Sequence, residues 1–146
     1  MLAPTKPLIM RITIDQYFGS KKHTPEHEVE AESLLLKVDM LLGEFELKTG
    51  LVIPIDSDTE THISGSKGGQ GDGGFRLSDT TTGRARSSHK EARGVDVCDI
   101  GETIDQWLND EILTKYGLYR ESPKFTVGWC HLTTRPPKSG RRTFIP

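Results

Sequence analysis

The sequence is poor in cysteine, in long apolar runs and in excess charge of one sign. Its two cysteines, Cys98 and Cys130, are too few for a disulfide scaffold. No apolar run approaches the roughly 18 residues of a membrane-spanning helix, so we expect no membrane partner. The formal net charge is −2, from 19 basic and 21 acidic residues, whereas general nucleic-acid binders usually carry a basic excess. The composition therefore argues against these three classes of protein.

The length of 146 residues suits one domain with a single hydrophobic core. We therefore treat residues 1–146 as one domain. The first residues, Met1 to Pro7, lack the apolar stretch of a secretory signal. Synthesis in the cytoplasm, without a signal peptide, is the resulting expectation.

Glycine is concentrated in one segment, since seven of the 15 glycines fall within residues 64–83. Such a segment is too flexible for a helix or a central strand. This glycine-rich segment (residues 64–83) is either a long surface loop near a functional site or a disordered linker between two halves of the chain.

A capped amphipathic helix is predicted to begin at Thr24. Thr24 suits the N-cap, and Pro25 suits the first helical position. Apolar residues then recur with a helical period, and Gly50 suits the position just past the last turn. The predicted apolar stripe consists of Val29, Leu34, Leu35, Val38, Leu41, Leu42 and Phe45.

Short strands and a second helix are predicted in the rest of the chain. Short apolar segments whose side chains alternate between two faces indicate the strands, and a 3.6-residue apolar period indicates the helix. The strands are 51–55, 94–100, 125–133 and 143–145, and the helix is 103–116, with Thr103 as its N-cap. This pattern predicts an α+β fold, a small antiparallel sheet with an N-terminal helix and a second helix packed on it.

Two histidines and one aspartate are the strongest candidates for a functional site. His89 precedes the predicted strand 94–100, Asp96 lies on that strand, and His131 lies on the later one. If the strands are neighbours, the three side chains converge and leave the fourth position of a tetrahedral zinc ion open to water. Zinc would lower the pKa of that water towards about 7 and polarise a carbonyl. By spacing alone, the alternative is one exposed histidine, one structural aspartate and one histidine on a strand surface.

The two cysteines belong to the same predicted strands. Cys98 follows Asp96 by two residues and is either an additional metal ligand or a small buried hydrophobic residue. Cys130 neighbours His131 and faces the opposite side of its strand. We therefore expect the two thiols to point to opposite faces of the sheet, where they cannot form a disulfide.

The motif Ser87-x-His89-x6-Asp96, followed by Trp129-x-His131, resembles the zinc D-alanyl-D-alanine carboxypeptidases and L-alanyl-D-glutamate endopeptidases. Their fold is shared with the hedgehog signalling domain. The resemblance extends from the glycines before Phe75 to the last histidine of the motif. It implies that His89, Asp96 and His131 are the zinc ligands.

The resemblance also assigns roles to residues around these ligands. Gly73-Gly-Phe-Arg76 resembles a family motif whose arginine holds a substrate carboxylate or carbonyl by a forked, charge-assisted contact. Arg76 would therefore orient the substrate and stabilise the oxyanion together with zinc. Ser87 would brace the loop or bond to the substrate. The chain exchanges the family's two small residues between the first two ligands, with Ala92 and Gly94, and both keep the loop tight.

One departure concerns the catalytic base. Many members of the family carry Asp or Glu three residues before the last histidine ligand, where it can accept a proton from the zinc-bound water. Gly128 stands at that position in this chain. The acids that could substitute for it are Glu91, Asp99, Glu102 and Glu121.

These residues predict a zinc metallopeptidase that cleaves an amide bond next to a D-amino acid in peptidoglycan stem peptides. A phage-encoded endolysin of this kind would be made in the cytoplasm and would act on the cell wall. The expected partner is a peptidoglycan peptide, without nucleic acid or membrane, and the expected state is a monomer. The alternative is a non-catalytic zinc-binding module on the same fold, either a phage structural protein or a cell-wall binder.

Overall fold

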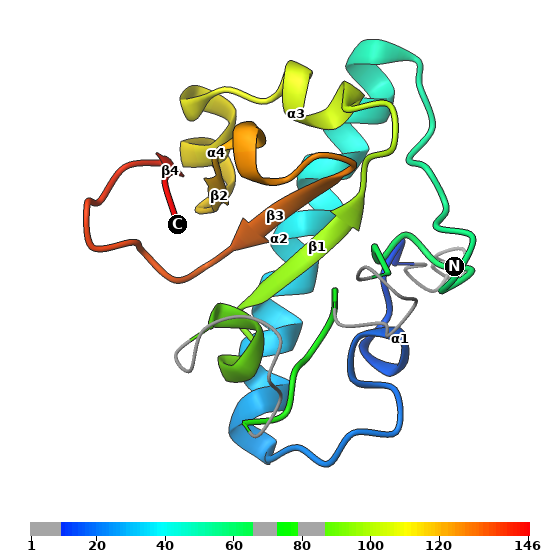
Figure 1. Cartoon of the computed structure of the whole chain (residues 1–146), viewed down its shortest axis with the longest axis vertical. Helices are drawn as coiled ribbons and strands as arrows, with labels where there is room; N and C mark the ends of the chain where they lie inside the picture. Colours follow the sequence, from blue (N-terminus) through cyan, green and yellow to red (C-terminus); the bar gives the residue numbers. More distant parts are fainter. Residues whose placement is uncertain (1–9, 66–72, 79–86) are drawn as a thin grey trace, which may run out of the picture.

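One long helix and a four-stranded sheet form the two main layers of the fold, with the helix behind the sheet in Figure 1. The computed structural model describes residues 10–65, 73–78 and 87–146. Its fold class is the predicted α+β. The elements are α1 (Ile14–Phe18), α2 (Pro25–Thr49), the 3₁₀ helix η1 (Ser88–Glu91), β1 (Gly94–Cys98), α3 (Thr103–Trp107), α4 (Asp110–Tyr116), β2 (Tyr119–Glu121), the 3₁₀ helix η2 (Pro123–Phe125), β3 (Trp129–Thr133) and β4 (Thr143–Phe144).

Helix α2 has the predicted ends, because local side-chain chemistry sets both of them. Thr24 Oγ1 accepts a hydrogen bond from His27 N at 3.1 Å, and His27 Nδ1 accepts one from Thr24 N at 3.1 Å. This is a capping box in which a histidine takes the place of the usual Glu or Gln. At the other end, Gly50 adopts a left-handed conformation with φ +71°, and its N–H donates to Glu46 O at 2.9 Å.

The buried face of α2 confirms most of the predicted stripe, but Val29 is a correction. Val29 is 66% exposed. It lies sixteen residues before Phe45, which at about 100° per residue places it roughly 160° around the helix. Ala31 occupies the core face in that part of the helix instead. The buried apolar residues of α2 are Ala31, Leu34, Leu35, Val38, Leu41, Leu42 and Phe45.

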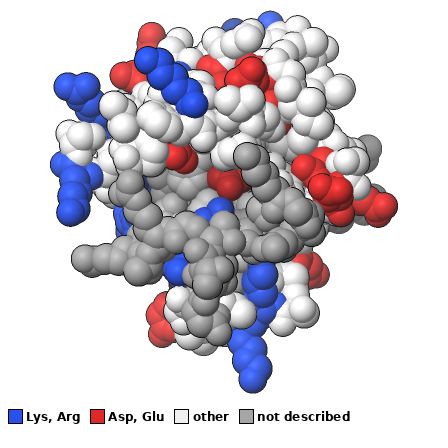
Figure 2. Space-filling view, viewed as in Figure 1, with Lys and Arg blue, Asp and Glu red and all other residues white. Residues whose placement is uncertain are grey.

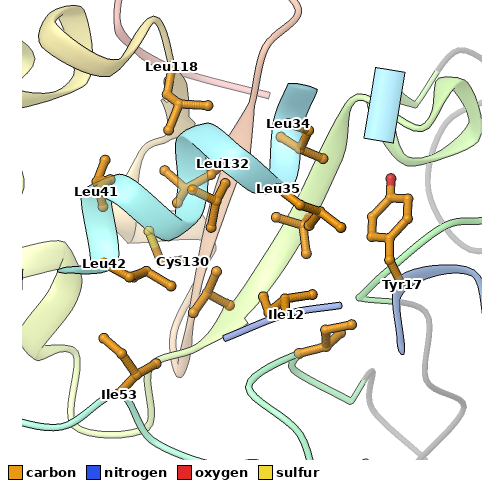
Figure 3. Close-up of a cluster of buried hydrophobic side chains, with 14 of the residues drawn as sticks. Ile12, Tyr17, Leu34, Leu35, Leu41, Leu42, Ile53, Leu118, Cys130 and Leu132 are labelled. Atoms are coloured by element: carbon orange, nitrogen blue, oxygen red, sulfur yellow. The ribbon is translucent and has the colours of Figure 1, made fainter. Parts of the chain in front are cut away.

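The hydrophobic core lies between α2 and one face of the sheet. Figure 3 shows Leu34, Leu35 and Leu41 of α2 beside Leu132 and Cys130 of β3. Val95 and Val97 of β1 belong to the same cluster of buried side chains. Because side chains alternate across a strand, the residues between these apolar ones leave the opposite face of the sheet. That face carries the candidate site.

The sheet has the strand order β1-β3-β2-β4 and is mixed rather than wholly antiparallel. Strands β1 and β2 both pair antiparallel to β3, whereas β2 pairs parallel to β4. Strand β4 lies outside β2, so it follows β3 in the chain without pairing with it. Because β2 runs antiparallel to β3 and parallel to β4, β4 runs opposite to β3. The predicted edge strand 143–145 is confirmed as β4.

The single helix predicted for 103–116 is interrupted. Leu108 has an extended conformation with ψ 144°, which ends α3. Asn109 then caps α4, since its Oδ1 accepts a hydrogen bond from Ile112 N at 2.9 Å. Asparagine is among the strongest N-cap residues, so this local interaction starts a new helix where the apolar period predicts a continuous one.

Thr103 is not the cap of α3. The cap position belongs to Glu102, which has a left-handed φ of 56° and makes no side-chain cap hydrogen bond. The buried carboxylate of Asp99 takes over this role, because its two oxygens accept from Ile104 N and Asp105 N, each at 2.9 Å. An aspartate placed before the helix thus satisfies the free N–H groups of its first turn.

Two further expectations changed in the structure. The segment 51–55 is irregular, and it buries Ile53 without forming a strand. The strand predicted for 125–133 begins only at Trp129, after η2 and a left-handed Gly128 with φ +92°. Most of the glycine-rich segment lies outside the described residues. Among the described residues, no helix has both the length and the apolar character needed to span a membrane.

A matched pair of valines in α2 tests the position of the core. Val38 is 1% exposed and Val29 is 66% exposed. We expect Val38→Ala to lower the free energy of unfolding by about 2 kcal/mol, because it removes buried methyl groups and leaves a cavity. The control Val29→Ala should change it by less than about 0.5 kcal/mol. Urea unfolding followed by circular dichroism measures both, and equal losses would contradict this placement of α2.

The two cysteines are buried on opposite faces of the sheet, as predicted. Cys98 pairs with Trp129 and Cys130 pairs with Val97 in the register of β1 and β3. Both thiols are free, and burial raises the pKa of each. We expect neither thiol to react with a disulfide reagent at pH 8 until the protein is unfolded, when both should react. Rapid labelling of either thiol in the folded protein would contradict this.

Candidate metal centre

Three elements bring the predicted ligands together on the face of the sheet that lies opposite the core. His89 comes from η1, Asp96 from β1 and His131 from β3. The register of β1 and β3 sets Asp96 directly opposite His131. One potential ligand atom from each of the three residues lies within 4.8 Å of the other two. The structure therefore brings together the histidines and the aspartate that the sequence analysis singled out, and Cys98 is not part of this cluster.

The distances between these atoms fit a small divalent ion. Asp96 Oδ1 lies 2.8 Å from His131 Nδ1 and 3.3 Å from His89 Nε2. Zinc binds nitrogen and oxygen at about 2.0–2.2 Å in tetrahedral geometry, which separates neighbouring ligand atoms by roughly 3.3–3.6 Å. Of the two pairs that include Asp96, one already has this separation, and the other needs less than about 1 Å of movement. The residues could thus hold a zinc ion with one position left open.

The orientation of His89 suits a metal ligand. Its Nδ1 lies 2.8 Å from the carbonyl oxygen of Gly74. Because a carbonyl can only accept, Nδ1 carries the proton and the lone pair of the neutral ring is on Nε2, the atom beside Asp96. A ligand histidine typically donates its other N–H in this way. Gly74 lies so close to Tyr17 that a Cβ on Gly74 would be 2.6 Å from the Tyr17 carbonyl oxygen. A side chain at position 74 would therefore disturb the contact between the Gly74 carbonyl and His89.

The serines that precede His89 hold the loop in place. Ser87 caps η1, and its Oγ accepts a hydrogen bond from His89 N at 3.3 Å. This is the bracing role that the resemblance allowed. Ser88 Oγ lies 3.4 Å from Nε2 of His131, the ring nitrogen that faces away from Asp96. A Cβ at Gly94 would lie 2.2 Å from the same Ser88 Oγ, so the small residue in the motif makes room for this contact.

Arg76 lies beside the cluster, buried to 9% exposure. Its backbone N–H donates to His89 O at 3.2 Å, which joins the Gly-Gly-Phe-Arg segment to η1. Its guanidinium Nη2 is 3.5 Å from Asp96 Oδ2, the oxygen that does not face the histidines. The cation is therefore within reach of a group bound at the cluster, as its predicted role requires.

The charges of the cluster suit metal binding. Burial by itself would raise the pKa of Asp96, but the adjacent His89 and His131 outweigh it and hold this pKa well below its usual range. Burial lowers the pKa of His89, an effect larger than the opposing attraction of Asp96. A metal needs an ionised carboxylate and neutral imidazoles as ligands. Asp96 and His89 favour these forms near neutral pH.

Some contacts of the site were missed by the sequence analysis. The Gly74 carbonyl and the Ser88 hydroxyl both orient a histidine of the cluster. Their only sequence signals are the Gly-Gly pair before Phe75 and the second serine of the motif. Phe144 of β4 also approaches the site, with its ring centroid 6.1 Å from that of His131. No feature of the sequence near Phe144 connects it with the motif.

Metal binding by the cluster is directly testable. We expect the purified protein to bind one zinc ion per chain and to gain thermal stability from it, because the folded state alone provides the assembled ligands. His89→Ala, Asp96→Ala and His131→Ala should each abolish this binding. His62→Gln is the control, since His62 lies outside the cluster with its Nδ1 2.9 Å from Pro54 O. Elemental analysis and calorimetry provide the measurements, and full zinc content in the alanine variants would refute the site.

Comparison of the chain with protein-family models, with curated proteins and with solved structures finds no match in any of the three.

Proposed function

We propose that the chain is a zinc-dependent peptidase that cleaves an amide bond next to a D-amino acid in peptidoglycan stem peptides. The convergence of His89, Asp96 and His131 within 4.8 Å is the observation that carries the proposal. Two histidines and one carboxylate with an open fourth position are typical of catalytic zinc sites, whereas structural sites are usually closed by four protein ligands. The motif that resembles the zinc carboxypeptidases supplies the substrate class.

The side chains around the cluster would have separate roles in such a reaction. When bound, zinc would activate a water molecule and polarise the carbonyl of the scissile bond. Arg76 would bind a carboxylate or the carbonyl of the substrate through its forked donors, a geometry that lysine lacks. Its contact with Asp96, at 3.5 Å, places the guanidinium beside the cluster. Ser87 would keep the His89 loop in position.

The surface charge supports a compact peptide substrate rather than a polyanion. Figure 2 shows the face of the molecule that is turned to the viewer in Figure 1. Over its described part, Lys and Arg are interspersed with Asp and Glu, without a continuous field of one sign. Nucleic-acid binding relies on such a basic field. We therefore place recognition in the site itself, and we expect a peptidoglycan peptide as the partner.

One observation favours the non-catalytic alternative, a zinc-binding module of a phage particle or of a cell-wall binder. Gly128, three residues before His131, provides no carboxylate to accept a proton. In that case the metal would join η1, β1 and β3 without turnover, and its effect would be limited to stability.

Digestion of purified peptidoglycan separates the two functions. The zinc-loaded protein should release peptide fragments with new termini next to a D-amino acid, detected by chromatography and mass spectrometry. His131→Ala should release none, because it removes a ligand, while circular dichroism shows that the fold is retained. A wild-type protein that binds zinc but releases nothing would exclude the peptidase and support the binding module.

Arg76→Lys tests the role of the guanidinium. It keeps the positive charge but loses the forked contact, so we expect kcat/KM on peptidoglycan fragments to fall about 10–100-fold, equivalent to roughly 1.5–3 kcal/mol. Zinc content should be unchanged. The control is Arg141→Lys, which alters an exposed arginine outside the cluster. If both variants retain wild-type kcat/KM, Arg76 does not contact the substrate.

A further inference from the structure

We propose that Glu121 of β2 is the proton acceptor of this site, in place of the acid that Gly128 cannot provide. The inference rests on the proposed function, because only a hydrolytic reaction at the cluster needs such a group. Its basis is the pairing of β2 with β3, whose register, continued by one residue, would bring Glu121 opposite His131. The two residues are separated by ten positions in the chain, and the family motif does not relate them.

The register of the sheet carries the argument. Strands β2 and β3 pair antiparallel, with Tyr119 opposite Thr133 and Arg120 opposite Leu132. The ladder ends at that second pair, and the same register continued by one residue would set Glu121 opposite His131. Residues directly opposite each other leave the same face of a sheet, with Cβ atoms about 4.5–5.5 Å apart. Since Asp96 in turn lies opposite His131, the same face carries one acidic side chain on each side of this histidine.

The neighbours of Glu121 support this orientation. Arg120 points to the other face, where its guanidinium donates to Asp105 O at 2.7 Å, so alternation turns Glu121 towards the site. Glu121 also pairs with Phe144 of β4, and the Phe144 ring lies 6.1 Å from the His131 ring. These neighbours put the side chains of Glu121 and Phe144 on the face of the sheet that carries the metal ligands. Glu121 is half-buried there.

The other acids considered for this role are placed less well. Both oxygens of Asp99 accept hydrogen bonds from the first turn of α3. Glu91 ends η1 and belongs to no strand of the sheet. Glu102 occupies the N-cap position of α3, beyond the end of β1. Within the described residues, Glu121 is thus the acid among these four that shares a strand register with a ligand.

The proposed proton transfer balances as an amide hydrolysis. The Glu121 carboxylate accepts one proton from the attacking water while the water oxygen forms a bond to the carbonyl carbon of the substrate. The carboxyl group then donates this proton to the amide nitrogen as the carbon–nitrogen bond breaks. Water is consumed, a carboxylic acid and an amine are released, and Glu121 returns to its carboxylate form. General acid–base catalysis of this kind contributes about 10²–10⁴-fold to the rate.

Acetohydroxamic acid provides a test that does not depend on peptidase activity. This probe binds catalytic zinc and passes its acidic proton to a nearby base. We expect Glu121→Gln to bind zinc as the wild type does but to bind acetohydroxamic acid at least 10-fold more weakly, measured by calorimetry on the zinc-loaded protein. Glu121→Asp should recover part of this affinity. The control Glu102→Gln should bind the probe as the wild type does.

Kinetics on peptidoglycan completes the test. Glu121→Gln should lower kcat by about 10²-fold or more at unchanged zinc content, whereas Glu102→Gln should retain wild-type kcat. A wild type that binds zinc and the probe but hydrolyses nothing overturns the proposed peptidase, and the role of Glu121 is then decided by the probe. Equal probe affinity, or equal kcat, in wild type and Glu121→Gln overturns the role of Glu121 alone. Absence of zinc binding by the wild type overturns both.

Discussion

The antiparallel pairing of β1 with β3 is the interaction on which both the hydrophobic core and the candidate metal centre depend. Its register sets Val97 opposite Cys130 on the core face and Asp96 opposite His131 on the other face. A shift of one residue in either strand would turn the ligands of that strand into the core and its apolar residues towards the site. Burying the ionised Asp96 carboxylate among leucines without a partner would be costly, so packing and site geometry select the same register.

The surrounding chain holds this register from several sides. The backbone of Asp96 donates to Gly73 O and accepts from Ser64 N, each at 2.8 Å, so the outer edge of β1 is paired as well. The hydroxyl of Tyr17 donates to the carbonyl of Gly94 at 2.8 Å and ties the N-terminal segment to the start of β1. These hydrogen bonds pre-organise the ligand positions, because each satisfies a backbone group that would otherwise be buried without a partner. A metal ion would then meet ligands that already converge.

The site could be predicted in part. The spacing of His89 and Asp96, with the distant His131, left a non-metal alternative open, and the resemblance to the zinc peptidases selected the three residues that the structure brings together. The position of Glu121 could not be predicted in this way, since the sequence analysis could only name it as one of four acids. Its placement depends on β2, a strand of three residues, Tyr-Arg-Glu, whose short polar sequence has no recognisable alternation.

The same division runs through the fold. Helix α2 was predictable to the residue because Thr24, Pro25 and Gly50 act on backbone groups within a few positions of themselves. The irregular course of 51–55 and the parallel pairing of β4 with β2 depend instead on partners far away in the chain. A strand needs a neighbouring strand to pair its backbone N–H and C=O groups, and no local sequence pattern indicates which neighbour that is. The ends of α2 could therefore be identified from residue types and spacing, and the candidate ligands from the motif resemblance, whereas strand partners are decided by non-local contacts.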